Sequence, residues 1–396
     1  MDNQLVSVIL KTGKEQSLKR FHPWVFSGAI NKISGSVTEG DVVNVLSEKG
    51  DFLGIGHYQP GSIAVRIFSF QDTVPDTDFW RVKIRKALQL RQQLGLYDNP
   101  ETNVFRLINA EGDGLPGLIV DYYNRVAVTQ MHSAGMYYLR NELAAILKEL
   151  LGDKLEAVYD KSNKSLPFRA DIASGDGYIL GGSTNDTIFE NGLKFYIDRE
   201  AGQKTGFYID QRDNRRLLEE YARGRDVLNL FGYTGAFSVY ALRGGAQSVH
   251  SVDSSVKAIE LADKNVNLNF PEAKNHLSFA ADAFEYLRNI KDKYDLIILD
   301  PPAFAKHRNA LTKALQAYKR INTRAFEQIR PGGIVFTFSC SQVVPREKFR
   351  EAVFSAAAIS GRQVHILNQL THPADHPIDI YHPEGEYLKG LVLLVE

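Results

Sequence analysis

Short apolar runs alternate with turn residues along the N-terminal part of the chain. The runs VSVIL, DVVNVL and SIAVRIFSF are separated by stretches that contain Gly40, Gly50 and Gly61. Short runs rich in β-branched and aromatic residues and bounded by glycine are typical of β-strands. The pattern predicts a small, strand-rich barrel over residues 1–74.

A second pattern begins near Asp78. The segment FWRVKIRKALQLRQQLG carries apolar residues at helical spacing and predicts a helix with Asp78 as its N-cap. The strand-like runs VFRLINAE, GLIVDYY and RVAVTQMH follow, then the helical stretch MYYLRNELAAILKELLG and the strand-like LEAVYD. We expect these elements to form a small α+β domain over residues 75–186, which ends in a connection rich in Gly, Ser and Asp from Pro167 to Thr187.

Residues 187–396 carry the pattern of a third domain. Asn191-Gly192, between TIFE and LKFY, is a strong hairpin signal. After Arg223, strand-like runs such as DVLNLF, SVHSVD, YDLIILD and GGIVFTFS alternate with helical stretches. Such alternation is typical of a mostly parallel sheet with helices on both faces. The fold is therefore predicted to be α/β, with a doubly wound, Rossmann-like C-terminal domain.

Composition and charge restrict the classes of function. Hydrophobic residues make up 44% of the chain and charged residues 24%, as in ordinary globular proteins. Lys plus Arg and Asp plus Glu both total 47, so a nucleic-acid site would have to be a local patch. The start MDNQLVSVILK does not read as a signal peptide and no apolar run reaches about 18 residues, so we expect a cytoplasmic protein without a membrane span. The single cysteine, Cys340, excludes an internal disulfide and a cysteine-based zinc site, and no metal is expected.

Polar and glycine residues follow the first three strands of the predicted C-terminal sheet. Gly232 and Gly235 follow the first strand, Asp253 ends the second and Asp282 follows the third. Ligands of open α/β sheets bind beyond the carboxyl ends of the strands, where Asp253 would reach ribose hydroxyls and Asp282 an adenine amino group. This arrangement predicts a nucleoside-bearing cofactor such as S-adenosylmethionine. The alternative is that the glycines form ordinary turns and that Asp253 caps a helix.

The fourth and fifth strands carry residues suited to chemistry on a base. Asp300 ends YDLIILD and is followed by Pro301 and Pro302, which lock an extended backbone. Such a motif is typical of methyltransferases that act on bases, including those that modify amino nitrogens. Cys340 follows the next strand, so we expect its thiol at the same edge of the sheet.

A thiol beside a carboxylate suits methylation of cytosine at carbon 5. That carbon becomes nucleophilic only after a thiolate has added to carbon 6, and cysteine can both add and leave again. A protonated Asp300 would hydrogen-bond cytosine N3 and stabilise the charge that develops there. The alternative for Cys340 is a buried structural thiol.

Several motifs resemble the bacterial ribosomal large-subunit RNA methyltransferase I family. They are GQKTGFYIDQRDNR, NLFGYTGAFS, LDPPAFAK, YKRIN, TFSCS and HPEGEYLKG, while QSLKRFHPWVFSGAI resembles the RNA-binding PUA domain that leads that family. The resemblance spans essentially the whole chain and implies an S-adenosylmethionine-dependent enzyme that makes 5-methylcytosine in 23S ribosomal RNA. It implies that Cys340 is the nucleophile and Asp300 the acid. The cofactor-binding residues expected from the strand ends and the resemblance are Tyr208, Gln211, Arg212, Asn229, Phe231, Gly232, Tyr233, Gly235, Asp253, Ser254, Asp282, Ala283 and Asp300.

Two basic segments are the candidate RNA contacts. Lys14, Arg20 and Trp24 lie close together in the N-terminal domain, and Lys306 and Arg308 follow the Asp-Pro-Pro motif. An enzyme that attacks a base needs that base flipped out of its stack, with phosphate contacts to hold the flanking strand. The expected partner is 23S ribosomal RNA or a large-subunit assembly intermediate, and a homodimer is left open. The alternative is that the aromatic residue belongs to the barrel core and the basic residues to a solvated face.

Two other functions fit parts of the pattern. A methyltransferase acting on a base nitrogen, such as guanine N7 or an amino group, would use Asp300 but would not need Cys340. A non-catalytic RNA-binding ribosome assembly factor could retain a vestigial cofactor pocket. Full methyl transfer by a Cys340→Ala protein would favour the first, and cofactor binding without a methylated product would favour the second.

Overall fold

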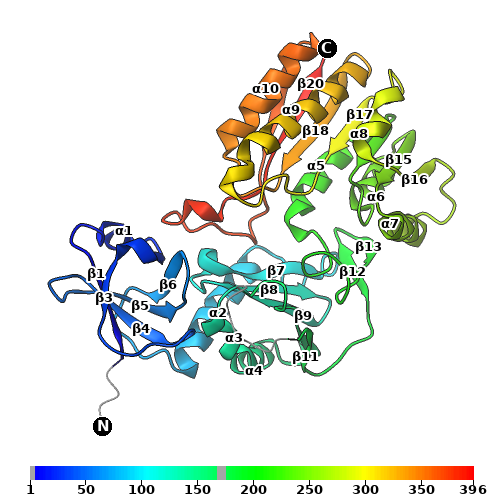
Figure 1. Cartoon of the computed structure of the whole chain (residues 1–396). Coiled ribbons are helices and arrows are strands. Elements are labelled where there is room, and N and C mark those ends of the chain that lie inside the picture. The colour runs from blue at the N-terminus through cyan, green and yellow to red at the C-terminus, as the bar shows by residue number, and fades with distance from the viewer. Residues whose placement is uncertain (1–4, 167–174) are drawn as a thin grey trace. The chain divides into compact units, whose positions relative to one another are not determined.

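The computed structural model describes residues 5–166 and 175–396, and its chain forms two compact units (Figure 1). The first unit comprises Met1–Ile188, Asp198–Phe207 and Ala374–Gly385, and the second comprises Phe189–Ile197, Tyr208–Pro373 and Glu386–Glu396. Each unit is therefore built from segments that are far apart in the sequence.

The N-terminal sheet of the first unit has six strands, in the order β2-β6-β5-β4-β1-β3. The strands are β1 (Ser7–Leu10), β2 (Trp24–Phe26), β3 (Ile30–Ile33), β4 (Val42–Leu46), β5 (Phe52–Tyr58) and β6 (Ile63–Ser69), with the short helix α1 (Gln16–Lys19) after β1. Alternate residues such as Val8, Leu10, Val43 and Val45 are fully buried in one cluster. This period of two explains why the strand-rich prediction for this region is confirmed.

The second sheet of this unit has the order β11-β10-β9-β8-β7. Its elements are α2 (Thr77–Gln93), β7 (Val104–Asn109), β8 (Leu118–Tyr123), β9 (Val126–Met131), α3 (Ala134–Tyr138), α4 (Arg140–Leu151), β10 (Ala157–Asp160) and β11 (Gly177–Leu180). The expected cap at Asp78 is wrong, because Asp76 is the N-cap and its carboxylate accepts from the Phe79 amide at 2.9 Å. The predicted connection contains a strand, since β11 pairs antiparallel with β10. Part of that connection, residues 167–174, lies outside the described residues.

The expected hairpin is present as β12 (Thr187–Glu190) and β13 (Leu193–Tyr196), which form a two-stranded sheet. Asn191 and Gly192 both have positive φ, 49° and 78°. This is the backbone that a two-residue turn requires, and Asn and Gly adopt it most readily.

The sheet of the second unit has seven strands, in the order β16-β15-β14-β17-β18-β20-β19. The strands are β14 (Asp226–Leu230), β15 (Ser248–Asp253), β16 (His276–Ala280), β17 (Leu296–Leu299), β18 (Gly333–Ser339), β19 (Val364–Leu370) and β20 (Lys389–Val395). The first five are parallel, and β20 lies antiparallel between β18 and β19. Strand order reverses at β14, so its carboxyl end and those of β15 and β17 lie at the point where such sheets bind ligands.

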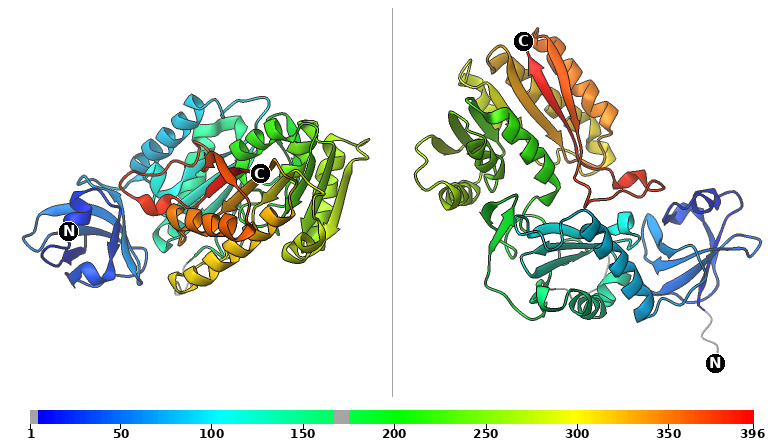
Figure 2. Two further views of the ribbon diagram at one scale, coloured as in Figure 1. Left: turned by 90° about the horizontal axis from the view of Figure 1, so that it is seen from above. Right: turned by 180° about the vertical axis from the view of Figure 1, so that it is seen from behind.

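Helices cover both faces of this sheet (Figure 2). They are α5 (Arg212–Ala222), α6 (Ala236–Arg243), α7 (Val256–Asn269), α8 (Ala283–Tyr286), α9 (Leu311–Gln328) and α10 (Arg346–Ser360). Residues of α8, α9 and α10 share one cluster with Leu228 and Leu230, whereas residues of α5 and α6 share another with Val227. Successive strand residues thus face opposite helix layers, which is the arrangement of the predicted doubly wound domain.

Candidate active site

The loop after β14 has a strained backbone. Phe231, Tyr233 and Gly235 have φ values of 61°, 43° and 70°. A left-handed conformation costs a non-glycine residue of order 1 kcal/mol or more and is common where a loop must hold a ligand. A Cβ on Gly235 would lie 2.8 Å from the Ala262 Cβ, so only glycine allows the loop to pack on α7 at this position.

A buried polar group beneath this loop fits a cofactor with donor groups. Asn229 is 1% exposed, and its Nδ2 donates to the Ser238 hydroxyl at 2.9 Å. Its Oδ1 has no hydrogen-bond partner among the residues that the structure describes. Buried oxygens are usually satisfied, so this acceptor at the end of β14 is consistent with a ligand donor such as the S-adenosylmethionine amino group.

The second and third strand ends carry the other expected cofactor residues. Asp253 accepts from the backbone amides of Tyr233 at 3.1 Å and of Ser255 at 2.9 Å, so it fixes the β14 loop as well as its own turn. Ser254 is exposed in that turn. Asp282 is also exposed and caps α8 by accepting from the Glu285 amide at 3.0 Å, and the adjacent Ala283 is buried. The alternative that Asp253 caps a helix is therefore wrong, because the N-cap of α7 is Ser255, whereas Asp282 is the N-cap of α8.

Cys340 is half-buried immediately after β18. Its thiol donates to the Pro301 carbonyl, with an Sγ–O separation of 3.7 Å, so it lies against the backbone of the Asp-Pro-Pro motif. Ser339 donates to the Tyr318 hydroxyl at 2.9 Å, and the Ser341 hydroxyl donates to the Ala305 carbonyl. Anchors on both sides of Cys340 fix the backbone from which the thiol projects.

Lys389 holds the turn that follows Cys340. It is 2% exposed, and its ammonium donates to the carbonyls of Ser341 at 2.8 Å and of Val344 at 2.6 Å. Burial lowers the pKa of Lys389 to about 8. Sequence alone offers no way to recognise this clamp, because the lysine lies 48 residues beyond its partner Ser341.

Asp300 is oriented by a short chain of amides. Gln211 Nε2 donates to Asp300 Oδ1 at 3.0 Å, and Asn214 Nδ2 donates to Gln211 Oε1 at 2.6 Å and to the Thr371 carbonyl at 3.2 Å. The Asn214 contact decides which end of the Gln211 amide faces Asp300. Gln211 is one of the expected cofactor residues, and in the structure its side chain contacts the candidate acid. The neighbouring Arg212 is 5% exposed.

Tyr208 lies between the cofactor loop and the candidate catalytic pair. Its ring meets that of Tyr233 edge to face, with centroids 5.3 Å apart. Burial raises the pKa of Tyr208, and the neighbouring Asp300 and Cys340 raise it further. The contact of Cys340 with the Pro301 carbonyl places the thiol against the residue that follows Asp300. The Tyr208 hydroxyl therefore stays protonated over the physiological range and can only donate or accept hydrogen bonds.

A buried ion pair between Arg215 and Glu190 contacts the backbone of Tyr208. Arg215 is paired through Nη2 and Nε with the carboxylate of Glu190, at 2.7 and 2.8 Å, and its Nη1 donates to the Tyr208 carbonyl at 2.9 Å. Glu190 is fully buried and also accepts from the Tyr240 hydroxyl at 3.0 Å. Sequence reasoning missed this pair, because Glu190 lies in the hairpin and Arg215 in a helix 25 residues away. Nothing in the sequence around either residue predicts the contact.

The expected RNA contacts fall into two groups. In the first unit, Trp24 donates from its indole to Glu111 at 2.8 Å and packs on His382, with centroids 4.3 Å apart, so it is tied into a polar and aromatic cluster. Lys14 and Arg20 are exposed. In the second unit, Lys306 and Arg308 are exposed in the segment between Asp300 and α9.

Two further properties bear on the function. No group of three or more His, Cys, Asp or Glu residues suited to holding a metal ion occurs within residues 5–166 and 175–396. Over the same described residues, every helix is too short or too polar to cross a bilayer.

Comparisons with known proteins agree with the geometry. The S-adenosylmethionine-dependent methyltransferase family matches residues 161–392, and the PUA-like domain family matches residues 8–70. Ribosomal RNA large subunit methyltransferase I of Alteromonas mediterranea is 41% identical to this chain, and the alignment covers 97% of the chain and 98% of that protein. The protein of the same name from Tolumonas auensis is 40% identical, with 98% of each covered.

A solved structure described as that of a methyltransferase complexed with SAH is 22% identical to this chain, with a TM-score of 0.85. The match covers 98% of this chain and 100% of that one. At this level of identity the likeness shows the fold, and it confirms the predicted fold class.

Proposed function

We propose that this chain, which belongs to the ribosomal RNA large subunit methyltransferase I family, methylates carbon 5 of a cytosine in 23S ribosomal RNA through a covalent Cys340 adduct. Membership of the family gives the general activity, without the position that is methylated. The protein is an S-adenosylmethionine-dependent ribosomal RNA methyltransferase, and its substrate is large-subunit RNA.

The proposed cofactor site is the carboxyl edge of β14, β15 and β16. The strained loop from Asn229 to Gly235 would face the amino acid part of S-adenosylmethionine, Asp253 the ribose and Asp282 the adenine. When bound there, the cofactor supplies an activated methyl group on a sulfonium. Tyr208 and Arg212 would complete the site from the segment that precedes and begins α5, and Gln211 between them would hold Asp300 in position.

Cys340 would act on the pyrimidine. Its thiolate forms a bond to carbon 6, and the electron pair of the double bond between carbons 5 and 6 moves through the ring, which makes carbon 5 nucleophilic. After methylation a base removes the proton from carbon 5, the bond to sulfur breaks, and the double bond and the thiolate are restored. Asp300 would donate a hydrogen bond to N3 while the adduct exists. The observation that carries this proposal is the contact between the Cys340 thiol and the Pro301 carbonyl. Pro301 directly follows Asp300 in the sequence.

Covalent trapping tests the proposed chemistry directly. A 23S ribosomal RNA transcript that contains 5-fluorocytosine cannot lose a proton at carbon 5, so wild-type protein and S-adenosylmethionine should give a complex that survives denaturing electrophoresis. Cys340→Ala protein should give none and should make no 5-methylcytosine, while its affinity for S-adenosylmethionine stays unchanged. Gln342→Ala protein, changed at an exposed position of the turn that follows Cys340, is the matched control. Full methyl transfer by Cys340→Ala protein, with the methyl group on a nitrogen, would contradict the proposal.

A further inference from the structure

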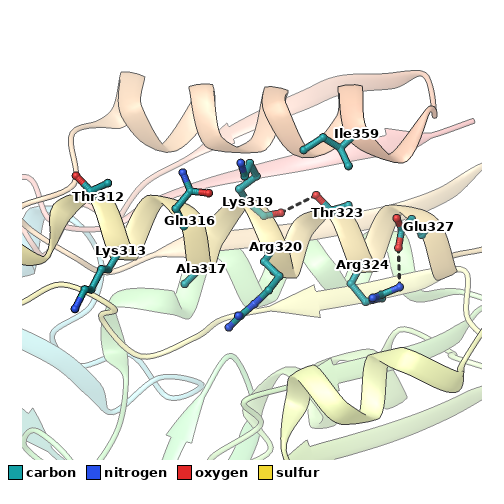
Figure 3. A pocket seen from close by; sticks show the side chains of 10 residues that line it. All are labelled: Thr312, Lys313, Gln316, Ala317, Lys319, Arg320, Thr323, Arg324, Glu327 and Ile359. Carbon is teal, nitrogen blue, oxygen red and sulfur yellow. Dashed lines mark hydrogen bonds and ion pairs between the residues drawn. The ribbon is translucent and has the colours of Figure 1, made fainter.

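The outer face of α9 carries a hollow of about 590 Å³ in the second unit (Figure 3). We call it the α9 groove, and it is lined by Thr312, Lys313, Gln316, Ala317, Lys319, Arg320, Thr323, Arg324, Glu327 and Ile359. All of these residues belong to α9 except Ile359, which lies on α10. Ala317 and Ile359 are apolar and five of the other eight residues are charged, whereas the centre of a protein interface is depleted in charged residues.

The charge of the groove is strongly positive for a protein whose total charge is zero. Four cations, Lys313, Lys319, Arg320 and Arg324, line it together with one acid, Glu327, which pairs with Arg324 at 2.9 Å. Figure 3 shows the side chains of Lys313, Arg320 and Arg324 extending from the same side of the helix. Their spacing of seven and four residues produces this alignment, and it spreads the charge over about 16 Å of helix axis.

The opposite side of α9 contacts the candidate active site. Tyr318 is fully buried, accepts a hydrogen bond from Ser339 next to Cys340, and packs on Phe304 of the Asp-Pro-Pro loop with ring centroids 4.8 Å apart. The helix also begins at Leu311, directly after the exposed Lys306 and Arg308. The basic residues therefore form a continuous series along the chain, from the Asp-Pro-Pro loop to the far end of α9.

Arg320 and Arg324 also line a second hollow, together with Asp282, Phe284, Glu285 and Arg288. The Arg320 guanidinium lies 4.6 Å from the centroid of the Phe284 ring, which fixes its plane but leaves its charge in place. The acids there are engaged, since Asp282 caps α8 and Glu285 pairs with Arg288 at 2.8 Å. With three arginines and two acids in its lining, the second hollow keeps a net positive charge.

We propose that the α9 groove binds the phosphate backbone of the RNA strand that flanks the target base. The inference rests on the proposed function for the identity of the RNA and deepens it, because it names the surface that holds the strand while the base occupies the site. Lysine and arginine at intervals along one helix match a linear polyanion, and such contacts fix register without reading sequence. Lys306 and Arg308 would begin this phosphate path at the catalytic loop.

The test removes the aligned charges without altering the fold. Lys313→Gln, Arg320→Gln and Arg324→Gln are combined in one variant, since glutamine favours helix and all three residues are exposed. The matched control removes three exposed charges at the opposite, amino-terminal edge of the sheet, with Lys274→Gln, Lys291→Gln and Lys293→Gln. Binding of an unmodified 23S ribosomal RNA transcript is measured by filter retention between roughly 50 and 200 mM salt.

Each lost phosphate contact on a single strand should reduce the slope of log affinity against log salt by about 0.7, so the triple variant should have a slope shallower by about two. Its affinity should fall, its KM for RNA should rise, and its kcat at saturating RNA should stay near that of the wild type. The control should match the wild type in all three measurements. An unchanged slope in the triple variant, or an equal change in the control, would overturn the proposal.

The binding measurement is independent of the methylated position. If the wild-type product carries its methyl group on a nitrogen, the proposed chemistry fails while the slope difference still stands. If 5-methylcytosine is made but the triple variant binds RNA as the wild type does, the chemistry stands and the α9 groove has no part in RNA binding.

Discussion

The side-chain amide of Gln211 donates a 3.0 Å hydrogen bond to Asp300 and thereby joins the turn before α5 to the end of β17. We expect Gln211→Leu to lower kcat by roughly 2- to 10-fold, because a hydrogen bond to a neutral carboxylic acid contributes about 0.5–1.5 kcal/mol. The dissociation constant of S-adenosylmethionine, measured by calorimetry, should change little if Gln211 acts by positioning Asp300. Gln247→Leu, at an exposed site, is the control. A weakened cofactor complex with an unchanged kcat would instead assign Gln211 to cofactor binding.

The buried pair of Arg215 and Glu190 should dominate the stability of its region. Arg215→Met leaves a buried carboxylate without its partner, and such losses cost about 3–5 kcal/mol. Differential scanning calorimetry should show this loss, and the double variant Arg215→Met with Glu190→Leu should recover much of it. Lys348→Met breaks the exposed pair with Glu351 and should cost under about 1 kcal/mol. Equal effects of the buried and exposed variants would refute this reading.

Gly235 and Gly361 allow backbone strain to be separated from crowding. Their φ values are 70° and 69°, but a Cβ would lie 2.8 Å from Ala262 at the first and would have no atom within 4 Å at the second. Gly361→Ala should cost only the strain, on the order of 1 kcal/mol. Gly235→Ala should in addition displace the β14 loop, so we expect S-adenosylmethionine to bind at least about tenfold more weakly, which is about 1.4 kcal/mol. Titration calorimetry on both variants checks this, and similar affinities would contradict it.

His57 should make the first unit sensitive to acid. Burial and, to a smaller extent, the positive charge of Arg66 lower the pKa of His57 to about 4, whereas the unfolded chain has an ordinary histidine pKa near 6.5. Between these values the unfolded state binds more protons, so stability is lost as pH falls from 6.5 towards 4. This group alone should remove about 2 kcal/mol between pH 7 and pH 5.

Tryptophan fluorescence during urea unfolding can measure this effect, because both tryptophans, Trp24 and Trp80, lie in the first unit. The His57→Gln protein should lose about 2 kcal/mol less than the wild type over the same pH range. His132 is buried with its pKa lowered to about 4 and should keep the variant partly acid-sensitive. His365→Gln, at an exposed position of the second unit, should behave as the wild type.

Local patterns were enough to predict the layers of the fold and the edge of the sheet that carries the site. Asp253, Asp300 and Cys340 directly follow or end strands, and the alternation of strand and helix predicts that such ends share one edge. The partners that hold them were not predictable, because Glu190, Asn214 and Lys389 reach their contacts only through tertiary packing. The N-cap of α2 was misplaced for a related reason. Asp76 and Asp78 are chemically equal as caps, and only the backbone path selects Asp76. The division into domains at residues 74 and 186 remains a proposal.

The interleaved course of the chain has a consequence for biosynthesis. The polypeptide leaves or re-enters the first unit after Ile188, Ile197, Phe207, Pro373 and Gly385. Asp375, in the last segment to join that unit, accepts from the Arg106 amide at 2.9 Å and is fully buried. Residues 374–385 must therefore be synthesised before the first unit can bury its final contacts, and a ribosome-bound chain that ends before residue 374 lacks this part of its core.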